Sequence, residues 1–381
     1  MNFPSLGDAD QYLEIAERCA ASLLGGEGSC YHEYRPIGIA LYYSVPFLFS
    51  TDVVTISYVT LLMNLALLGV LMLSGVHIIR SLSGLRVGGA LWGFRCGEIF
   101  FLLSIIFISV GFIPVRLADH QSLALFVAAV AVLIAQRNTR QPTPLVLAGL
   151  LAGASVLMKQ NYAVAIVFLV LNWLIFGGRH EFRRNLRAVF WFGVGASLGL
   201  LQIAWVYYHS GEMWLYSWKA MEIFAPVNRQ PVVELVAFTE PQKAGYLSNL
   251  AQPVSEVQYF AIKFYQGLTK FYWAVYSGRA PLNVTPEIVD YTPAEIVRFQ
   301  VVYILVALAS LSSLLTKERW VAIFVMTAFC SLSLGTAIAH MESRYFLMLR
   351  FAFLVFAVVV FNKMLAYRVH GRNAISSQVA S

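Results

Sequence analysis

Long apolar stretches alternate with short polar ones along most of the chain. A run of roughly 17 to 25 apolar residues is long enough to cross a bilayer as a helix. Such runs occur at 53 to 79, 97 to 114, 120 to 136, 188 to 208, 297 to 315, 320 to 339 and 345 to 362. Between 144 and 176 the pattern breaks at Lys159, in the sequence KQNY, and leaves two short apolar arms.

Clusters of positive charge decide how often this broken region crosses the membrane. Arg137 and Arg140 precede it, and four arginines between 179 and 187 follow it. Because Lys and Arg tend to stay on the cytoplasmic side, both clusters belong to the same side, and the region crosses twice with a turn at Lys159. The same reasoning along the whole chain predicts an all-α polytopic membrane protein with about nine transmembrane helices.

This count divides the chain into five segments. They are an outer-face first loop with juxtamembrane helices at 1 to 52, transmembrane helices at 53 to 209, a long outer-face loop at 210 to 296, C-terminal transmembrane helices at 297 to 362, and a cytoplasmic tail at 363 to 381. An outward N-terminus ahead of an odd number of spans predicts either a true start further upstream or the loss of a first helix.

Composition supports a membrane protein and argues against nucleic acid as a partner. The chain is 59% hydrophobic and only 12% charged, far from the roughly one-quarter charged norm of soluble domains. Its net charge of +7 is scattered between apolar runs and forms no single basic face. Cys96 and Cys330 lie at or within apolar runs, whereas Cys19 and Cys30 flank one polar stretch; the sequence leaves a disulfide between these two undecided.

The first polar segment, GDADQYLEIAERCA at 7 to 20, predicts a helix over 8 to 24. Helical spacing places Asp8 and Tyr12 on one face and Asp10 on roughly the opposite one. Asp8 followed by Gln11 is typical of a capping box, and an aspartate fixed near a lipid surface can also take a proton from a hydroxyl. Both interpretations of Asp8 stand, and they are compatible.

Two cations face the predicted outer side. Arg35 precedes an amphipathic stretch, PIGIALYYSVPFLF, that is expected to lie along the membrane surface. Lys159 ends an apolar arm on the side that positive residues tend to avoid. Each can extend its charge to the headgroups, or it can hold an anionic group such as a phosphate.

Two later outer turns carry further candidates. Asp119 and His120 can bind a divalent ion or orient a substrate hydroxyl, although Asp119 can also simply cap the next helix. The stretch HMESRYFLMLR places Glu342, Arg344 and Tyr345 before the last span. Arg344 offers a forked donor for phosphate, and Glu342 joins Asp119 and His120 as a metal or substrate candidate.

Several of these motifs, in order, resemble the C-type membrane glycosyltransferases, a group that includes protein O-mannosyltransferases and lipid A aminoarabinose transferases. The likeness lies in DADQYLEIA, YRPIGIALYY, ADHQSLALF, GASVLMKQNY and ESRYF, and it covers most of residues 7 to 350. The commoner acidic pair of that group is Asp-Glu, and here it is Asp8-Ala9, which leaves the part of Asp10 open. The first transmembrane helix of the group is missing from the sequence pattern, and no large soluble domain follows.

The resemblance implies transfer of a sugar from a polyprenyl-phosphate carrier to a glycan, lipid or protein acceptor on the outer face of a bacterial inner membrane. It assigns Asp8 as the general base, with Asp10 as a second catalytic candidate, and it implies no certain cofactor, although a divalent cation stays an option. It gives the donor-binding residues as Tyr12, Arg35, Lys159, Arg344 and Tyr345. The main alternative is a transporter or lipid-linked sugar flippase, which tends to carry ionisable residues near the bilayer midplane.

Overall fold

The computed structural model describes a helical protein. It describes residues 7–33, 35–83, 96–109, 113, 118–136, 139–176, 182–215, 308–315, 348 and 351–364. Every regular element within these ranges is a helix, which confirms the all-α prediction for this part of the chain.

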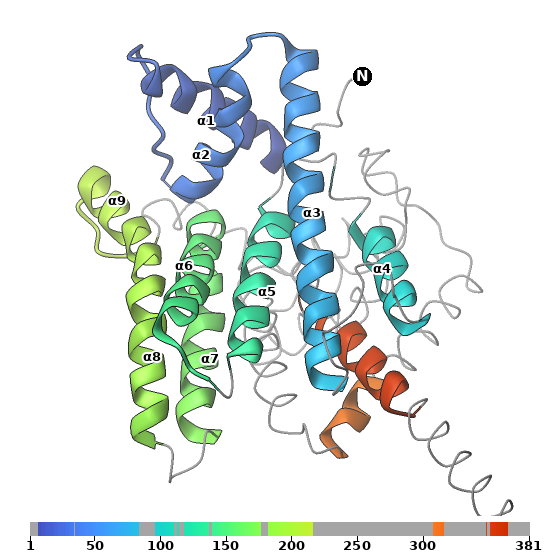
Figure 1. Cartoon of the computed structure of the whole chain (residues 1–381). Coiled ribbons are helices and arrows are strands. Elements are labelled where there is room, and N and C mark those ends of the chain that lie inside the picture. The colour runs from blue at the N-terminus through green and yellow to red at the C-terminus, as the bar shows by residue number, and fades with distance from the viewer. Residues whose placement is uncertain are drawn as a thin grey trace, which may run out of the picture.

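Figure 1 shows how the described helices are arranged. They are α1 (Gly7–Leu23), α2 (Ile37–Ser44), η1 (Val45–Leu48), α3 (Val53–Ser83), α4 (Cys96–Ser109), α5 (Asp119–Ala135), α6 (Pro142–Met158), α7 (Tyr162–Phe176), α8 (Phe182–Ala196), η3 (Ser197–Leu200), α9 (Leu201–Ser210), η4 (Ser312–Leu315) and a helix at Phe351–Met364.

Two helical segments are long and apolar enough to span a membrane. They are α3, with 31 residues, and the continuous segment α8–η3–α9, Phe182–Ser210, with 29. Of their most apolar windows, 33% and 28% of the residues are buried inside the protein. The other apolar helices have 10–17 residues, and a helix of 17 rises about 26 Å, slightly less than the hydrocarbon core. The count of about nine spans stays a prediction.

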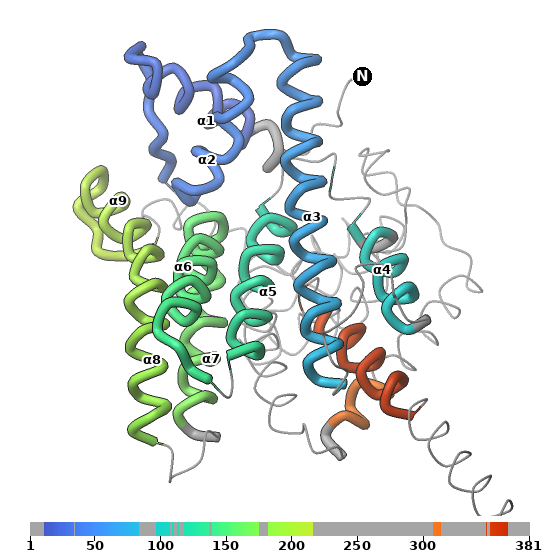
Figure 2. The backbone as a smooth tube through the Cα atoms, in the orientation of Figure 1, coloured from blue at the N-terminus to red at the C-terminus, as the bar shows by residue number. Residues whose placement is uncertain are grey.

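The chain breaks at Lys159, where the sequence pattern places a turn. Helix α6 ends at Met158, Lys159 has an extended backbone with φ −153° and ψ 106°, and α7 begins at Tyr162. The region is therefore two helices and not one long helix. Figure 2 shows the chain reversing direction between them.

Glycines let α6 and α8 pack backbone against backbone. Gly149 and Gly153 on α6 face Gly195 near the end of α8 and Gly199 in η3, and each motif has the spacing of a small-residue pair four apart. A Cβ added at Gly195 would overlap the carbonyl oxygen of Val146. These helices belong to a core that also takes in α3, α4, α5, α7 and the helix at Phe351–Met364.

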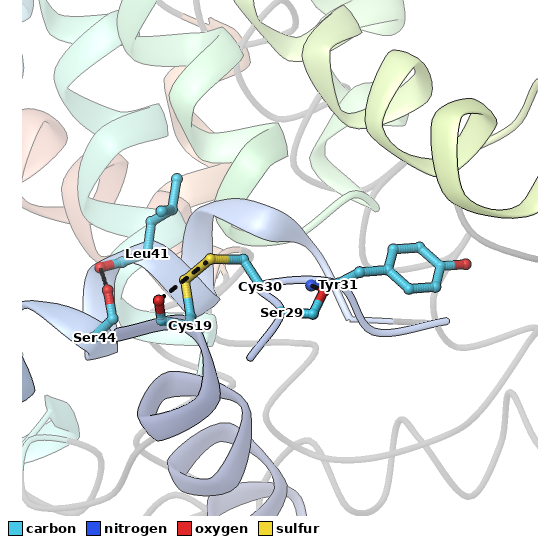
Figure 3. Close-up of a disulfide and its surroundings, with 6 residues drawn as sticks. All are labelled: Cys19, Ser29, Cys30, Tyr31, Leu41 and Ser44. Atoms are coloured by element: carbon cyan, nitrogen blue, oxygen red, sulfur yellow. Dashed lines mark hydrogen bonds between the residues drawn. A yellow bond between two sulfur atoms is a disulfide. The ribbon is translucent and has the colours of Figure 1, made fainter. Parts of the chain in front are cut away.

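The first-loop unit, meaning α1, α2 and η1 with the loop that joins them, lies across one end of the bundle (Figure 1). A disulfide between Cys19 and Cys30 ties the end of α1 to the loop before α2 (Figure 3). The unit meets the bundle closely, because a Cβ at Gly38 would run into the backbone of Leu157 on α6. The Ile37 N–H also donates to Gln202 Oε1 on α9 at 3.0 Å.

Candidate functional site

A buried ion pair lies at the end of the bundle that the first-loop unit covers. Lys159, just after α6, pairs with Asp119, the first residue of α5, and their side chains are only 16% and 7% exposed. The chain break after α6 brings Lys159 to this level, and the carboxylate also suits the positive end of the α5 dipole. The N-cap position of α5 belongs to Ala118, without a side-chain cap, so pairing and not helix capping accounts for Asp119.

Polar side chains from α5 and α7 surround this pair. Tyr162 forms a side-chain hydrogen bond with Ser122 and lies near Asp119. His120 is 1% exposed. The backbone of Asn64 approaches its ring, but neither ring nitrogen has a partner of hydrogen-bond geometry within the described chain. A buried polar group without a partner costs about 1–3 kcal/mol, so His120 is a group that a ligand hydroxyl or a water molecule would satisfy.

The first-loop unit packs directly on the neighbours of the ion pair. Tyr12 from α1 and Tyr43 from α2 form one buried cluster with Ala118, the residue before Asp119. Met158, the residue before Lys159, packs against the same cluster. Tyr12 therefore lies over the Asp119 end of α5, and residue 8 lies one turn earlier along the same side of α1.

Arg35 is turned toward α1. Its Nε and Nη2 donate to Gln11 Oε1 at 3.2 and 2.6 Å, and its guanidinium lies 4.9 Å from the ring centroid of Tyr12. The Arg35 side chain therefore contacts α1 and does not extend toward lipid headgroups. Gln11 Oε1 thus serves as the acceptor for Arg35, and both interpretations of Asp8 stay predictions.

Burial and positive charge together suppress the ionisation of His32, in the loop between α1 and α2. Burial, and then the nearby Arg35 and Arg18, lower the pKa of His32 to about 4. The imidazole is therefore neutral at pH 7, and an anion bound beside these two arginines would favour its protonation.

A buried hydrogen-bond network joins α2 to the bundle beside this site. Tyr42 Oη donates to Asn64 Oδ1 at 3.0 Å, and Gln121 Nε2 donates to both Asn64 Oδ1 and Tyr43 Oη, at 2.7 and 2.8 Å. Asn64 Nδ2 donates to the carbonyl of Ile113 at 2.8 Å. Asn64 and Gln121 were not predicted from the sequence. The feature that could have indicated them is a lone amide side chain in or beside an apolar run.

The remaining predicted residues are only partly placed. Asp8 and Asp10 lie in the first turn of α1, where the described structure gives the backbone course but no side-chain contacts. Glu342, Arg344 and Tyr345 lie outside the described residues. The structure therefore brings together Tyr12, Arg35, Asp119, His120 and Lys159 at one end of the bundle.

The Asp119 and His120 pair does not fit a divalent cation in this arrangement. The Asp119 carboxylate already pairs with the Lys159 ammonium, whose charge would repel a metal ion. Across the described ranges no three His, Cys, Asp or Glu side chains gather as a metal site would require. A substrate hydroxyl is the better partner for His120.

Comparison with known proteins adds no name to this site. Searches of protein-family models, of curated proteins and of solved structures found no match to the chain.

Proposed function

We propose that this protein is a membrane glycosyltransferase that moves a sugar from a polyprenyl-phosphate carrier to a glycan, lipid or protein acceptor. The observation that carries the proposal is the packing of the first-loop unit on Ala118 and Met158, which are the chain neighbours of the Asp119–Lys159 pair. Asp8 and Asp10 belong to α1 of this unit, and Lys159 directly follows Met158. That combination suits an acceptor hydroxyl that must lose a proton and a phosphate that must leave.

In the proposed reaction the acceptor oxygen attacks the anomeric carbon of the donor. Asp8 takes the hydroxyl proton, with Asp10 as the other carboxylate available at the start of α1. The bond between the anomeric carbon and the carrier phosphate oxygen breaks, and the lipid phosphate keeps the electron pair. Lys159 and Arg344 stabilise the charge that grows on this phosphate, with Arg35, Tyr12 and Tyr345 lining the donor site.

The ion pair gives Lys159 a specific part in this scheme. In the structure its charge is balanced by Asp119, which offsets the cost of keeping an ammonium buried. A carrier phosphate would compete with Asp119 for the ammonium. Asp119 and His120 would then be left to hold substrate hydroxyls.

The disulfide supports an outer-face site. Disulfides persist in oxidising compartments, and the Cys19–Cys30 bond lies in the first-loop unit. A bacterial inner membrane with the site toward the periplasm is the setting that we propose for it. Residues 210 to 296 are expected to complete the outer side.

The test is sugar release from a panel of polyprenyl-phosphate sugars by the purified protein. Loss of a general base lowers turnover by about 100-fold or more, so Asp8→Asn should be inactive at normal expression. Asp10→Asn is measured beside it, because loss of turnover in Asp10→Asn with an active Asp8→Asn would assign the base to Asp10 instead. Equal activity of Asp8→Asn and the parent protein would contradict the role of Asp8.

A transporter or lipid-linked sugar flippase is the second candidate, and one observation favours it. Glu98 on α4 is 1% exposed and is held by Arg80 on α3, with Nε and Nη2 donating at 2.9 and 2.8 Å. Arg80 is in the last turn of α3 and Glu98 in the first turn of α4, so this pair, like Asp119–Lys159, joins a buried carboxylate to a cation at helix ends. Ionisable pairs among apolar helices also mark ion and substrate paths in transporters. Gradient-driven uptake by proteoliposomes, without sugar release from any donor, would favour this candidate.

A further inference from the structure

The ion pair is largely buried in this structure, and the first-loop unit packs on the chain neighbours of both partners. Asp119 and Lys159 are 7% and 16% exposed, and the apolar contact above them runs from Tyr12, Ile39 and Tyr43 to Ala118. Any ligand with a phosphate or a hydroxyl that reaches this pair from the side of the first-loop unit must therefore displace that contact.

Polar contacts beneath α2 centre on Asn64. Its Oδ1 accepts from Tyr42 and from Gln121, its Nδ2 donates to Ile113 O, and Gln121 also donates to Tyr43. Asn64 is 0% exposed, so each of these bonds is made where water competes least. Hydrogen bonds require defined distances and angles, so this network adds directional constraints on α2 to the apolar contact.

We propose that Asn64 is a positioning residue that latches the first-loop unit onto the bundle, and that release of this latch opens the Asp119–Lys159 pair to ligand. Through Tyr42 and Tyr43 it fixes α2, and α2 fixes Tyr12 over Ala118. The inference goes beyond sugar transfer, because a transporter would need the same opening.

Accessibility of residue 118 measures the latch directly. Ala118 is 2% exposed beneath Tyr12 and Tyr43. In the full chain with Cys96→Ala, Cys330→Ala and Ala118→Cys, the single free thiol reports on the cover, since Cys19 and Cys30 are in a disulfide. The measurement is the rate of modification by a membrane-impermeant methanethiosulfonate, divided by the rate for the same protein denatured at the same pH.

Three substitutions in this background distinguish release of the first-loop unit from general destabilisation of the protein. Asn64→Leu removes every hydrogen bond of the amide, and we expect about tenfold faster modification. Thr60→Val is the matched control one turn away, because the Thr60 hydroxyl bonds only within α3, to Ile56 O, and is equally buried. We expect it to react at the rate of the parent.

The variant Asn64→Asp tests whether the modification rate depends on pH, which a purely structural role of Asn64 would not cause. A neutral carboxyl keeps both acceptor contacts and can donate to Ile113 O, whereas the carboxylate cannot donate. Burial raises the pKa of such a carboxyl, so the variant should match the parent at about pH 5.5 and react faster at about pH 8.5. The titratable groups nearby are Tyr42 and Tyr43 from α2, His120 and Asp119 from α5, and Lys159 after α6; the parent at both pH values controls for them.

Each result decides the matter. Parent-like rates for Asn64→Leu, or equally fast rates for Thr60→Val, would overturn the latch, and so would a pH-independent Asn64→Asp. If Asn64→Leu does not accumulate as folded protein, Asn64→Asp carries the test alone, since it is compared with itself at two pH values.

Discussion

At the scale of single residues, the Asp119–Lys159 pair is the strongest electrostatic feature of the site. Removing one partner of a buried pair leaves an uncompensated charge, which costs about 3–5 kcal/mol. We therefore expect Asp119→Asn to lower the melting temperature of the purified protein clearly. The double variant Asp119→Asn/Lys159→Met should cost less than the sum of the single variants, because it buries no charge.

An exposed pair in the same chain is the control for that cycle. Glu14 and Arg18 are 69% and 47% exposed at 3.9 Å, one turn apart on α1. Glu14→Gln should therefore change stability by less than about 0.5 kcal/mol. Equal effects of Glu14→Gln and Asp119→Asn on the melting temperature would refute the special weight given to the buried pair.

His32 makes stability depend on pH. Its pKa in the folded protein is lowered to about 4 by burial, Arg35 and Arg18, whereas in the unfolded chain it is about 6.5. The unfolded state thus binds the proton first, and stability falls as the pH drops from about 6.5 to about 4. We expect the melting temperature of His32→Gln to fall less than that of the parent over this window, and parallel curves would contradict the assignment.

The candidate residues show what a sequence can and cannot predict. Asp119 and Lys159 were predicted as candidates because charged groups at the ends of apolar runs are conspicuous, whereas Tyr12 was predicted from the family resemblance. Their partners were not, since the pairing of Lys159 with Asp119 and of Arg35 with Gln11 depends on which helix ends meet. Asn64 was missed for the opposite reason, because one amide inside an apolar run carries little weight until its tertiary partners are known.

At the scale of elements, hydrophobic periodicity predicted where several helices lie. The helix predicted at 8 to 24 is found at Gly7–Leu23, and the break predicted at Lys159 separates α6 from α7. Within the predicted run at 97 to 114, the described helix is Cys96–Ser109. The break could be predicted because polar residues interrupt an apolar run at that point.

The α6 and α8 contact yields an element-scale prediction. A Cβ at Gly195 would overlap the carbonyl oxygen of Val146, whereas a Cβ at Gly193, on the same helix, meets nothing within 4 Å. Gly195→Ala should therefore destabilise the protein by about 1–3 kcal/mol, and Gly193→Ala should be neutral or slightly stabilising. Thermal unfolding of both variants in detergent checks this, and similar melting temperatures would mean that the helices separate at little cost.

At the scale of the whole molecule, the two ends of the bundle differ in character. One end carries the disulfide, the first-loop unit and the Asp119–Lys159 pair. At the other end, Arg140 lies in the turn between the end of α5 and the start of α6, and the sequence places Arg137 in the same connection. An oxidised end opposite a basic end is what a membrane protein with its first loop outside the cell would show.

This polarity predicts the orientation of the chain, and thiol accessibility in intact spheroplasts measures it. In a Cys96→Ala, Cys330→Ala background, an impermeant reagent should modify Cys19 and Cys30 only after reduction. Thr139→Cys, at an exposed position between α5 and α6, should react only after the membrane is opened, because α5 separates it from Asp119. Modification of Thr139→Cys from outside would place both ends of α5 on one side. That result would reject the assignment of α5 as a crossing, and with it the outer-face site for sugar transfer.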